Sequence, residues 1–420
     1  MTDEATLSMR ERGLLAVAPA ARIMTSMLMG TSLAVFIGQR GSPFAVSMVM
    51  TAYFIGLMFF APIWGAIADV TGRRRTVLIG TGVVATVVVL PLTVVDGVWG
   101  PIGLRALYAI FAAGFMPVML SIVSAHGGAE GRGRSIGFFN SARAVGFTGA
   151  QLGAGFLLGI MLPGELFFVV AAISLVSTVA VAFLSDPAPQ PAGEPTVAEV
   201  ISEVRTRLVP AVENRDHLRT NGLQWLYVAL ALRNMTVLGV GSLLPPYLID
   251  NVGVSAFVMG ALLALNPGSQ TVCMYAFGKI ADAAGRKPLI VGGMAGSALY
   301  AILLAGAILP STVLVRAIVA GGGLLLLGAA YSAMTTGTLA FIGDVAPDVR
   351  EGELMGLRST AKGVGGVLGP PLIGVVATYT SYELAFGVGS VLAIIATGLA
   401  ATALVESRPT DEPVGTVADD

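Results

Sequence analysis

The chain has 420 residues, of which 55% are hydrophobic and only 12% are charged, and its formal net charge is −1. A soluble protein carries about 25% charged residues, so this composition excludes an ordinary soluble domain and requires an apolar surrounding such as a lipid bilayer. The single cysteine, Cys273, excludes a framework of disulfides within the chain.

Apolar runs recur along almost the whole chain. A membrane-spanning helix needs about 20 mostly apolar residues. Twelve runs meet this requirement, near residues 14–38, 44–67, 75–96, 100–125, 135–160, 164–184, 222–248, 255–279, 288–309, 311–343, 354–378 and 383–405. We therefore predict an all-α polytopic membrane protein with twelve transmembrane helices.

Arginine and lysine gather in alternate loops. With the N-terminus inside, the inner loops receive Arg10, Arg12, Arg73, Arg74, Arg75, Arg132, Arg134, Lys279, Arg286, Lys287 and Arg350. The outer loops receive Arg40 and little else. The positive-inside rule then predicts a multi-pass protein of the plasma membrane with both termini in the cytoplasm. We expect it to be a monomer.

The loop 185–221 divides the chain. Within it Val197, Val200, Ile201, Val204 and Leu208 fall on one face at helical spacing. This pattern predicts an amphipathic helix on the inner membrane surface. The predicted organisation is a six-helix bundle, a cytoplasmic linker, a second six-helix bundle and an acidic, disordered tail, with boundaries 1–184, 185–221, 222–405 and 406–420.

The two halves repeat each other at three places in the same order. A loop motif comprises Gly65, Asp69, Gly72, Arg73 and Arg74 in the first half, and Gly278, Asp282, Gly285, Arg286 and Lys287 in the second. Arg22-Ile-Met24-Thr25 matches Arg233-Asn-Met235-Thr236, and Arg143-Ala-Val145-Gly146 matches Lys362-Gly-Val364-Gly365. The repeats predict two pseudo-symmetric six-helix bundles, an arrangement that carriers build around a midplane binding site.

The paired loops resemble the signature loop of the major facilitator superfamily, roughly G-x-x-x-D-x-x-G-R-R/K. Arg105 with Gly114 is similar to a second motif of that family. The resemblance implies secondary active transport of a small solute by alternating access. Gly365-x3-Gly369-Pro370 resembles a Gly-Pro motif that many exporters carry in the fifth helix, where this chain has Ala150-Gln151 instead.

Asp69 and Asp282 close the cytoplasmic ends of two predicted helices. A carboxylate there can accept hydrogen bonds from neighbouring arginines and can sit at the positive end of a helix. We expect these loops to latch the two bundles together as a cytoplasmic gate. The alternative is that their charges only anchor the helices at the lipid headgroups.

Four cations lie inside predicted spans: Arg22, Arg143, Arg233 and Lys362. Ionisable residues in a membrane are costly and by default indicate function. Cations that face one wet cavity favour an anionic substrate, since arginine binds carboxylate or phosphate bidentately. The arrangement is similar to organophosphate carriers of the family, which use one arginine in each half. Alternatively these side chains reach the inner surface or pair with Asp344, and Arg105 is a structural anchor.

Neutral polar residues complete the expected cavity: Thr25, Asn234, Thr236, Asn266, Gln270 and Tyr331. No Asp or Glu lies near the middle of a span, which disfavours a proton-coupled exporter of cationic drugs. An exporter of hydrophobic compounds and a transporter-like solute receptor remain alternatives, and a proton or counter-anion could be coupled. No nucleotide-binding loop, Ser–His–Asp set or metal-ligand cluster occurs. We therefore expect no enzyme activity, cofactor, metal or nucleic-acid partner.

Overall fold

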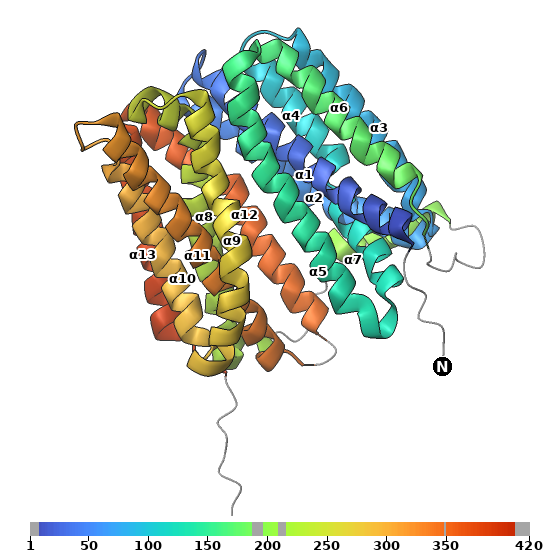
Figure 1. The fold of residues 1–420 in the computed structure, drawn as a ribbon. Coiled ribbons are helices and arrows are strands. Elements are labelled where there is room, and N and C mark those ends of the chain that lie inside the picture. The colour runs from blue at the N-terminus through green and yellow to red at the C-terminus, as the bar shows by residue number, and fades with distance from the viewer. Residues whose placement is uncertain (1–7, 187–195, 209–215, 348–349, 408–420) are drawn as a thin grey trace, which may run out of the picture.

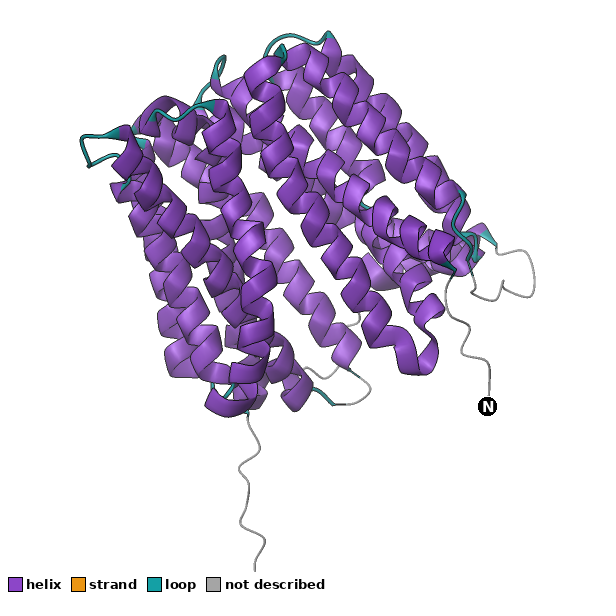
Figure 2. Ribbon diagram, viewed as in Figure 1, coloured by secondary structure: helices purple, strands orange, loops and turns teal. Residues whose placement is uncertain are grey.

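A computed structural model describes residues 8–186, 196–208, 216–347 and 350–407. Within these ranges the chain is almost entirely helical and contains no strand (Figure 2). In the described part of the chain, eleven helical segments are long and apolar enough to cross a membrane. The predicted all-α membrane fold is confirmed.

The first bundle comprises α1 (Met9–Gly38), α2 (Pro43–Thr71), α3 (Arg74–Val89) with a short 3-10 turn (Leu90–Thr93), α4 (Trp99–Ala112), α5 (Phe115–Ile160) and α6 (Pro163–Ala182). Helix α5 turns back at Gly128, whose φ of 59° only glycine adopts without strain. The fourth span is thus Trp99–Gly128. The expected span 135–160 corresponds to the part of α5 after Gly128. This part is helical, but it is not one of the eleven membrane-spanning segments.

The second bundle comprises α8 (Leu223–Pro246) with the π-helical turn η3 (Tyr247–Val252), α9 (Ala256–Ala284), α10 (Arg286–Gly306), α11 (Val313–Val345), α12 (Glu351–Tyr379) and α13 (Tyr382–Ala403). Between the bundles lie α7 (Val197–Leu208) and a 3-10 segment, η2 (Asp216–Gly222). The predicted boundaries of the linker and the tail stay predictions, because much of both lies outside the described residues.

Local sequence explains where several helices begin. Ser42, Ser255 and Ser381 each accept a hydrogen bond from a backbone N–H of the first turn, the usual role of an N-cap serine. Pro43 follows directly as the first residue of α2, where its missing N–H costs nothing. Gly72 ends the same helix in the left-handed conformation, with φ of 63°.

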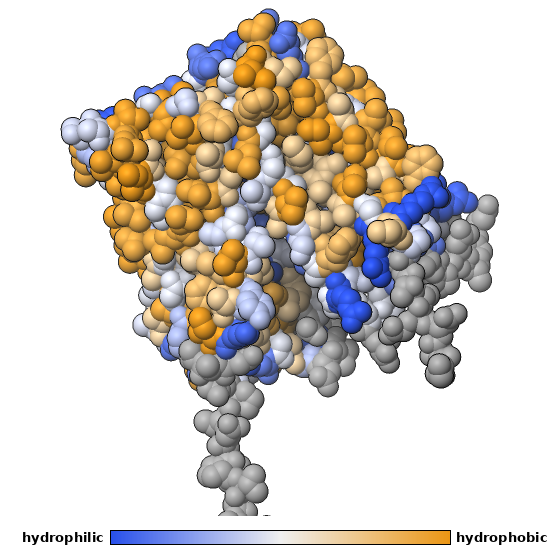
Figure 3. All heavy atoms as spheres, viewed as in Figure 1, coloured by the Kyte–Doolittle hydropathy of each residue, from blue (hydrophilic) through white to orange (hydrophobic). Residues whose placement is uncertain are grey.

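The outer surface is apolar over much of its height. Large side chains such as Phe59, Phe168 and Ile394 are more than half exposed, and hydrophobic residues cover most of both bundles in Figure 3. Helices in a membrane satisfy their backbone hydrogen-bonding groups internally, so their apolar side chains can face the lipid. This surface fits a protein embedded in a bilayer.

Both described termini lie at one end of the molecule, here called the terminal side, and the opposite end is called the far side (Figure 1). The halves meet mainly along two helix pairs, α2 with α12 and α5 with α9, and α8 also contacts α1 and α2. Close backbone contacts occur toward the far side, where Gly155 and Gly260 cross and Gly38 meets Pro246. Toward the terminal side Figure 3 shows the molecule hollowed between the bundles. The structure is therefore closed at the far side.

Candidate functional site

A cavity of about 170 Å³ lies between the two bundles. Its walls come from α1, α2, α4 and α5 of the first half and from α8 to α11 of the second. Apolar side chains such as Met27, Met50, Phe147 and Leu263 make up most of the lining. No acidic residue of the described chain lines the cavity. A pocket of this kind, apolar with a few polar groups, is typical of small-molecule sites.

Arg105 is the charged residue that lines this cavity. Its side chain is 2% exposed, and Nη2 donates a hydrogen bond to the carbonyl oxygen of Ser26 at 3.0 Å. The guanidinium carbon stands 4.3 Å from the centre of the Tyr53 ring. Gly30 makes room for it, since a Cβ there would lie 3.2 Å from Nη2. The sequence predicts an anchoring role for Arg105 because the residue lies near the outer end of its helix. Position along a helix can be counted from the sequence, but the direction in which the side chain points cannot.

Other polar groups surround the cavity in both halves. Thr31 donates a hydrogen bond to Gln151 at 3.1 Å, which joins α1 to α5. Tyr300, on α10, lines the cavity from the opposite half and is fully buried. Of the six neutral residues that the sequence indicated, Asn266 lines the cavity. Gln270 donates a hydrogen bond to the side-chain oxygen of Asn266 at 2.9 Å.

Cations from both halves act electrostatically on Tyr331 of α11, and the guanidinium carbon of Arg233 stands 5.6 Å from the centre of its ring. Lys362, Arg358 and Arg233 all interact electrostatically with its hydroxyl. Arg143, from α5 of the other half, also interacts with Tyr331, and its Nη1 donates to Asn140 at 3.0 Å. We call Arg143, Arg358 and Lys362 the basic cluster. Arg358 was missed by sequence reasoning, although it precedes Lys362 by one helical turn.

Arg22 and Arg233 point into the interiors of their own bundles. Arg22 is 3% exposed, lies 5.2 Å from the centre of the Phe115 ring and fits against Gly82 on α3. The Nε of Arg233 donates to Ser297 on α10 at 2.9 Å. Neither arginine lines the cavity. Arg233 is nevertheless near the cavity, since it interacts electrostatically with the lining residue Tyr300.

Three of the expected neutral residues use their side chains within a bundle. Thr25 donates a hydrogen bond to the carbonyl of Ala21 at 2.8 Å, and Asn234 donates to Leu230 at 2.8 Å. Thr236 donates to the carbonyl of Gly389 on α13 at 2.6 Å. The first two bonds lie within one helix, α1 and α8 respectively, and the third joins α8 to α13. Interhelical hydrogen bonds of this last kind are common in membrane proteins.

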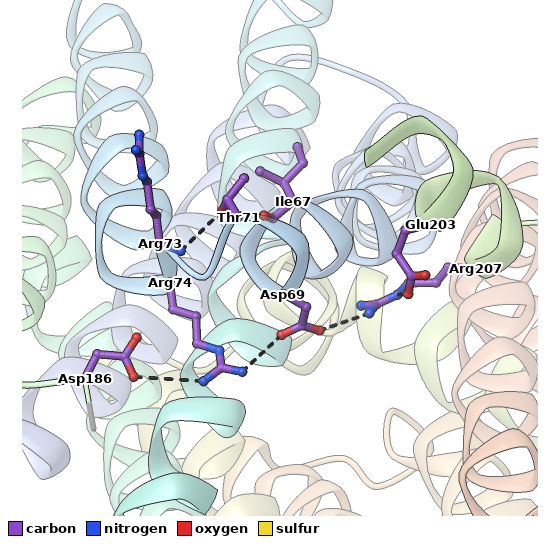
Figure 4. A network of polar contacts seen from close by, with 8 residues as sticks. All are labelled: Ile67, Asp69, Thr71, Arg73, Arg74, Asp186, Glu203 and Arg207. Carbon is purple, nitrogen blue, oxygen red and sulfur yellow. Dashed lines mark hydrogen bonds and ion pairs between the residues drawn. The ribbon is translucent and has the colours of Figure 1, made fainter. Parts of the chain in front are cut away.

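The first loop motif binds the linker helix (Figure 4). Asp69 lies 3.5 Å from Arg74, and Arg207 of α7 donates to its other oxygen at 3.0 Å. Arg207 also donates to Glu203 at 2.8 Å. Gly65 leaves room for this arginine, since a Cβ would lie 3.0 Å from its Nη1. Burial alone would lower the pKa of Arg207, but its hydrogen bonds to the two carboxylates outweigh this effect and raise that pKa.

Arg73 and Arg74, at the start of α3, have different roles. The backbone N–H of Arg73 donates to the hydroxyl of Thr71 at 3.3 Å. Arg74 reaches from Asp69 to Asp186, 4.0 Å away at the start of the linker (Figure 4). In this state of the protein the motif therefore contacts linker residues.

The second loop motif binds the C-terminal segment instead. The carboxylate of Glu406 accepts hydrogen bonds from the backbone N–H groups of Arg286 at 2.9 Å and Lys287 at 3.0 Å, at the start of α10. Arg286 also donates to Asp344 at 3.0 Å. Gly285 has a φ of 93° beside this carboxylate, and Gly278 has open space around it. The side chain of Asp282 lies outside the described residues.

Sequence comparison finds one family along the chain. The family model of the Major Facilitator Superfamily matches residues 15–324 and 322–419. The multi-drug resistance efflux pump PmrA of Streptococcus pneumoniae is 23% identical over 83% of this chain and 84% of the pump. An uncharacterised MFS-type transporter of Methanocaldococcus jannaschii is 24% identical over 74% of this chain and 77% of its own length.

Solved structures share the same fold. The crystal structure of a mutant of the nucleoside transporter NupG superimposes with a TM-score of 0.76 at 12% identity, and the match covers 93% of this chain and 98% of that chain. A bacterial homologue of the human lysosomal transporter Spinster, in an inward-facing and unoccupied conformation, gives a TM-score of 0.71 at 15% identity. That match covers 94% of this chain and 97% of the other.

Proposed function

The chain belongs to the major facilitator superfamily of membrane transporters, and from this premise we propose that it carries a small organic anion by alternating access. The observation that supports an anion is the positive charge at the cavity and near it, since Tyr331 lies one helical turn beyond the lining residue Leu327 on α11. Arg105 lines it, and the basic cluster gathers at Tyr331, whereas no acidic residue of the described chain is among the lining residues. Two unit charges 4 Å apart near a protein surface interact by about 4 kcal/mol, so this field attracts anions and repels cations.

The closed far side supports alternating access. Contacts such as Gly155 with Gly260 hold the halves together at that end, while the molecule is hollowed toward the terminal side. Opening the far side while the terminal side closes would move the binding site between two aqueous compartments. We further propose that the terminal side faces the cytoplasm and that the protein lies in the plasma membrane, because the arginines of the inner loops are at that side.

A second candidate is export of hydrophobic or amphipathic compounds. Its support is the mostly apolar lining of the cavity and the relationship to a protein described as a multidrug efflux pump. The two candidates differ in the charge of the substrate. A neutral or cationic amphipathic compound gains nothing from the basic cluster, whereas an anion does.

Uptake into proteoliposomes tests the proposal. The panel contains benzoate, octanoate and glycerol phosphate as anions, and ethidium as an amphipathic cation. We expect uptake of at least one anion, and at least tenfold less of it in Arg143→Gln and Lys362→Gln. The control is Arg134→Gln, an exposed arginine on the same helix as Arg143. Transport of ethidium alone would contradict the proposal, and uniform uptake by all three variants would contradict the role of the basic cluster.

A further inference from the structure

The guanidinium of Arg105 has hydrogen-bonding capacity that the protein does not use. Nη2 is bonded to Ser26, but Nε and Nη1 are buried and have no hydrogen-bond partner among the described residues. The Tyr53 ring faces the guanidinium and supplies a π contact, yet it offers no acceptor oxygen in the plane of the N–H groups. A buried, incompletely paired cation is costly, and an anion in the cavity would relieve that cost through charge-assisted hydrogen bonds.

Tyr300 presents a second unused donor from the opposite half. It is fully buried and lines the same cavity as Arg105. Its hydroxyl has no hydrogen-bond partner among the described residues, whereas buried tyrosine hydroxyls usually find one. Both residues lie about two helical turns from the far-side ends of their helices, α4 and α10. They are therefore at similar depth, beneath the closed end of the molecule.

The rest of the cavity selects for apolar groups. Met27, Val49, Leu238, Leu324 and Leu327 line it together with the residues named above. Its volume of about 170 Å³ suits a short acyl chain or a single aromatic ring. Burying such a group removes apolar surface from water, which favours binding. The basic cluster lies nearer the terminal side, so an anion that enters from that side meets it first.

We infer that Arg105 and Tyr300 form an anchoring subsite for the carboxylate of an amphipathic substrate whose acyl or aryl body fills the apolar cavity. This inference rests on the proposed transport of anions and narrows the substrate class. Nε and Nη1 of Arg105 donate hydrogen bonds to the carboxylate, and the hydroxyl of Tyr300 donates a hydrogen bond to the same group. The bound substrate joins the two bundles, since Arg105 belongs to the first and Tyr300 to the second.

Calorimetric titration of the purified full-length protein with octanoate tests the subsite, with octanamide as the uncharged probe. We expect the wild type to bind octanoate at least tenfold more tightly than octanamide. Arg105→Gln should lose at least tenfold in affinity for octanoate, and Tyr300→Phe about tenfold, the loss expected for a hydrogen bond to a charged group. Tyr247→Phe is the matched control, because that buried hydroxyl donates to the carbonyl of Leu304 and does not line the cavity.

The conservative Tyr300→Phe keeps the test valid if Arg105→Gln does not fold, which the thermal unfolding temperature of each variant reports. Wild-type affinity in Tyr300→Phe and in folded Arg105→Gln would overturn the subsite. If Arg143→Gln still weakened binding and uptake in that case, the proposed function would stand without this anchor. A wild type that bound no octanoate would also overturn the inference, and the proteoliposome panel would then show separately whether any anion is carried.

Discussion

Adding one methyl group at the crossing of α5 and α9 should open the far side. A Cβ on Gly260 would lie 2.6 Å from the carbonyl oxygen of Gln151 and 2.6 Å from the Cα of Gly155. Both are backbone atoms of the other half, so neither can move aside without separating the two helices. Overpacking of this kind costs about 1–3 kcal/mol. The cost falls on the state that is closed at the far side, because opening that side removes the contact.

The equilibrium between the two states of Gly260→Ala should therefore shift by about 5- to 150-fold toward the open far side. A cysteine in place of Leu263, which lines the cavity, reports the shift in a Cys273→Ser background. We expect a membrane-impermeant maleimide added at the far side to label Gly260→Ala faster by that factor.

Gly159→Ala is the matched control, because it makes the same change one helical turn beyond Gly155, where a Cβ meets nothing within 4 Å. Its labelling rate should equal that of the unmodified reporter. Equal labelling of folded Gly260→Ala and Gly159→Ala would show that the crossing does not close the far side, and the reasoning would be wrong.

Four further variants test other parts of the structure. Arg22→Met and Arg233→Met should retain uptake of the transported anion within about threefold, and a tenfold loss would show that these arginines belong to the substrate site. Arg22→Met should not lower the unfolding temperature, because replacing a buried charge by an apolar residue is often neutral or stabilising. Arg207→Ala should speed hydrogen exchange in the linker helix, unlike Arg205→Ala, and change global stability by less than about 1 kcal/mol since the pair is partly exposed. Glu406→Ala should lower stability by about 0.5–2 kcal/mol, as the loss of a helix cap does, and an unchanged unfolding temperature would refute that role.

The sequence predicted the fold well because membrane helices are specified by length and apolarity. The start of α2 at Pro43 and its end beside Gly72 follow from local rules, and the observed helices other than α4 and α5 lie within a few residues of expected segments. The turn at Gly128 lies between the expected spans 100–125 and 135–160, inside α5, and depends on one glycine with a positive φ. No periodic pattern indicates such a turn.

Which side chains face the cavity could not be predicted in the same way, because depth and direction are separate properties of a side chain. Counting residues places Arg22 and Arg233 near the midplane of the membrane. Successive helical residues differ by about 100° in direction, so a small error in the rotation of the helix turns a side chain from the cavity to the interior of its own bundle. The same counting left Arg105 outside the expected cavity, which it lines in the structure. What fixes its direction is the missing side chain of Gly30 on a neighbouring helix, a contact between residues distant in sequence.

The positions of Arg105 and Tyr300 on opposite bundles also bear on how a substrate could drive the transport cycle. A ligand shifts a conformational equilibrium only by its difference in affinity for the two states. A carboxylate bound to both residues has such a difference, since separating α4 from α10 would break one set of hydrogen bonds. Contacts with Arg105 alone would move with the first bundle and bias neither state. The measurement that separates these cases is the effect of octanoate on labelling at Leu263→Cys, which should slow in the wild type and stay constant in Tyr300→Phe.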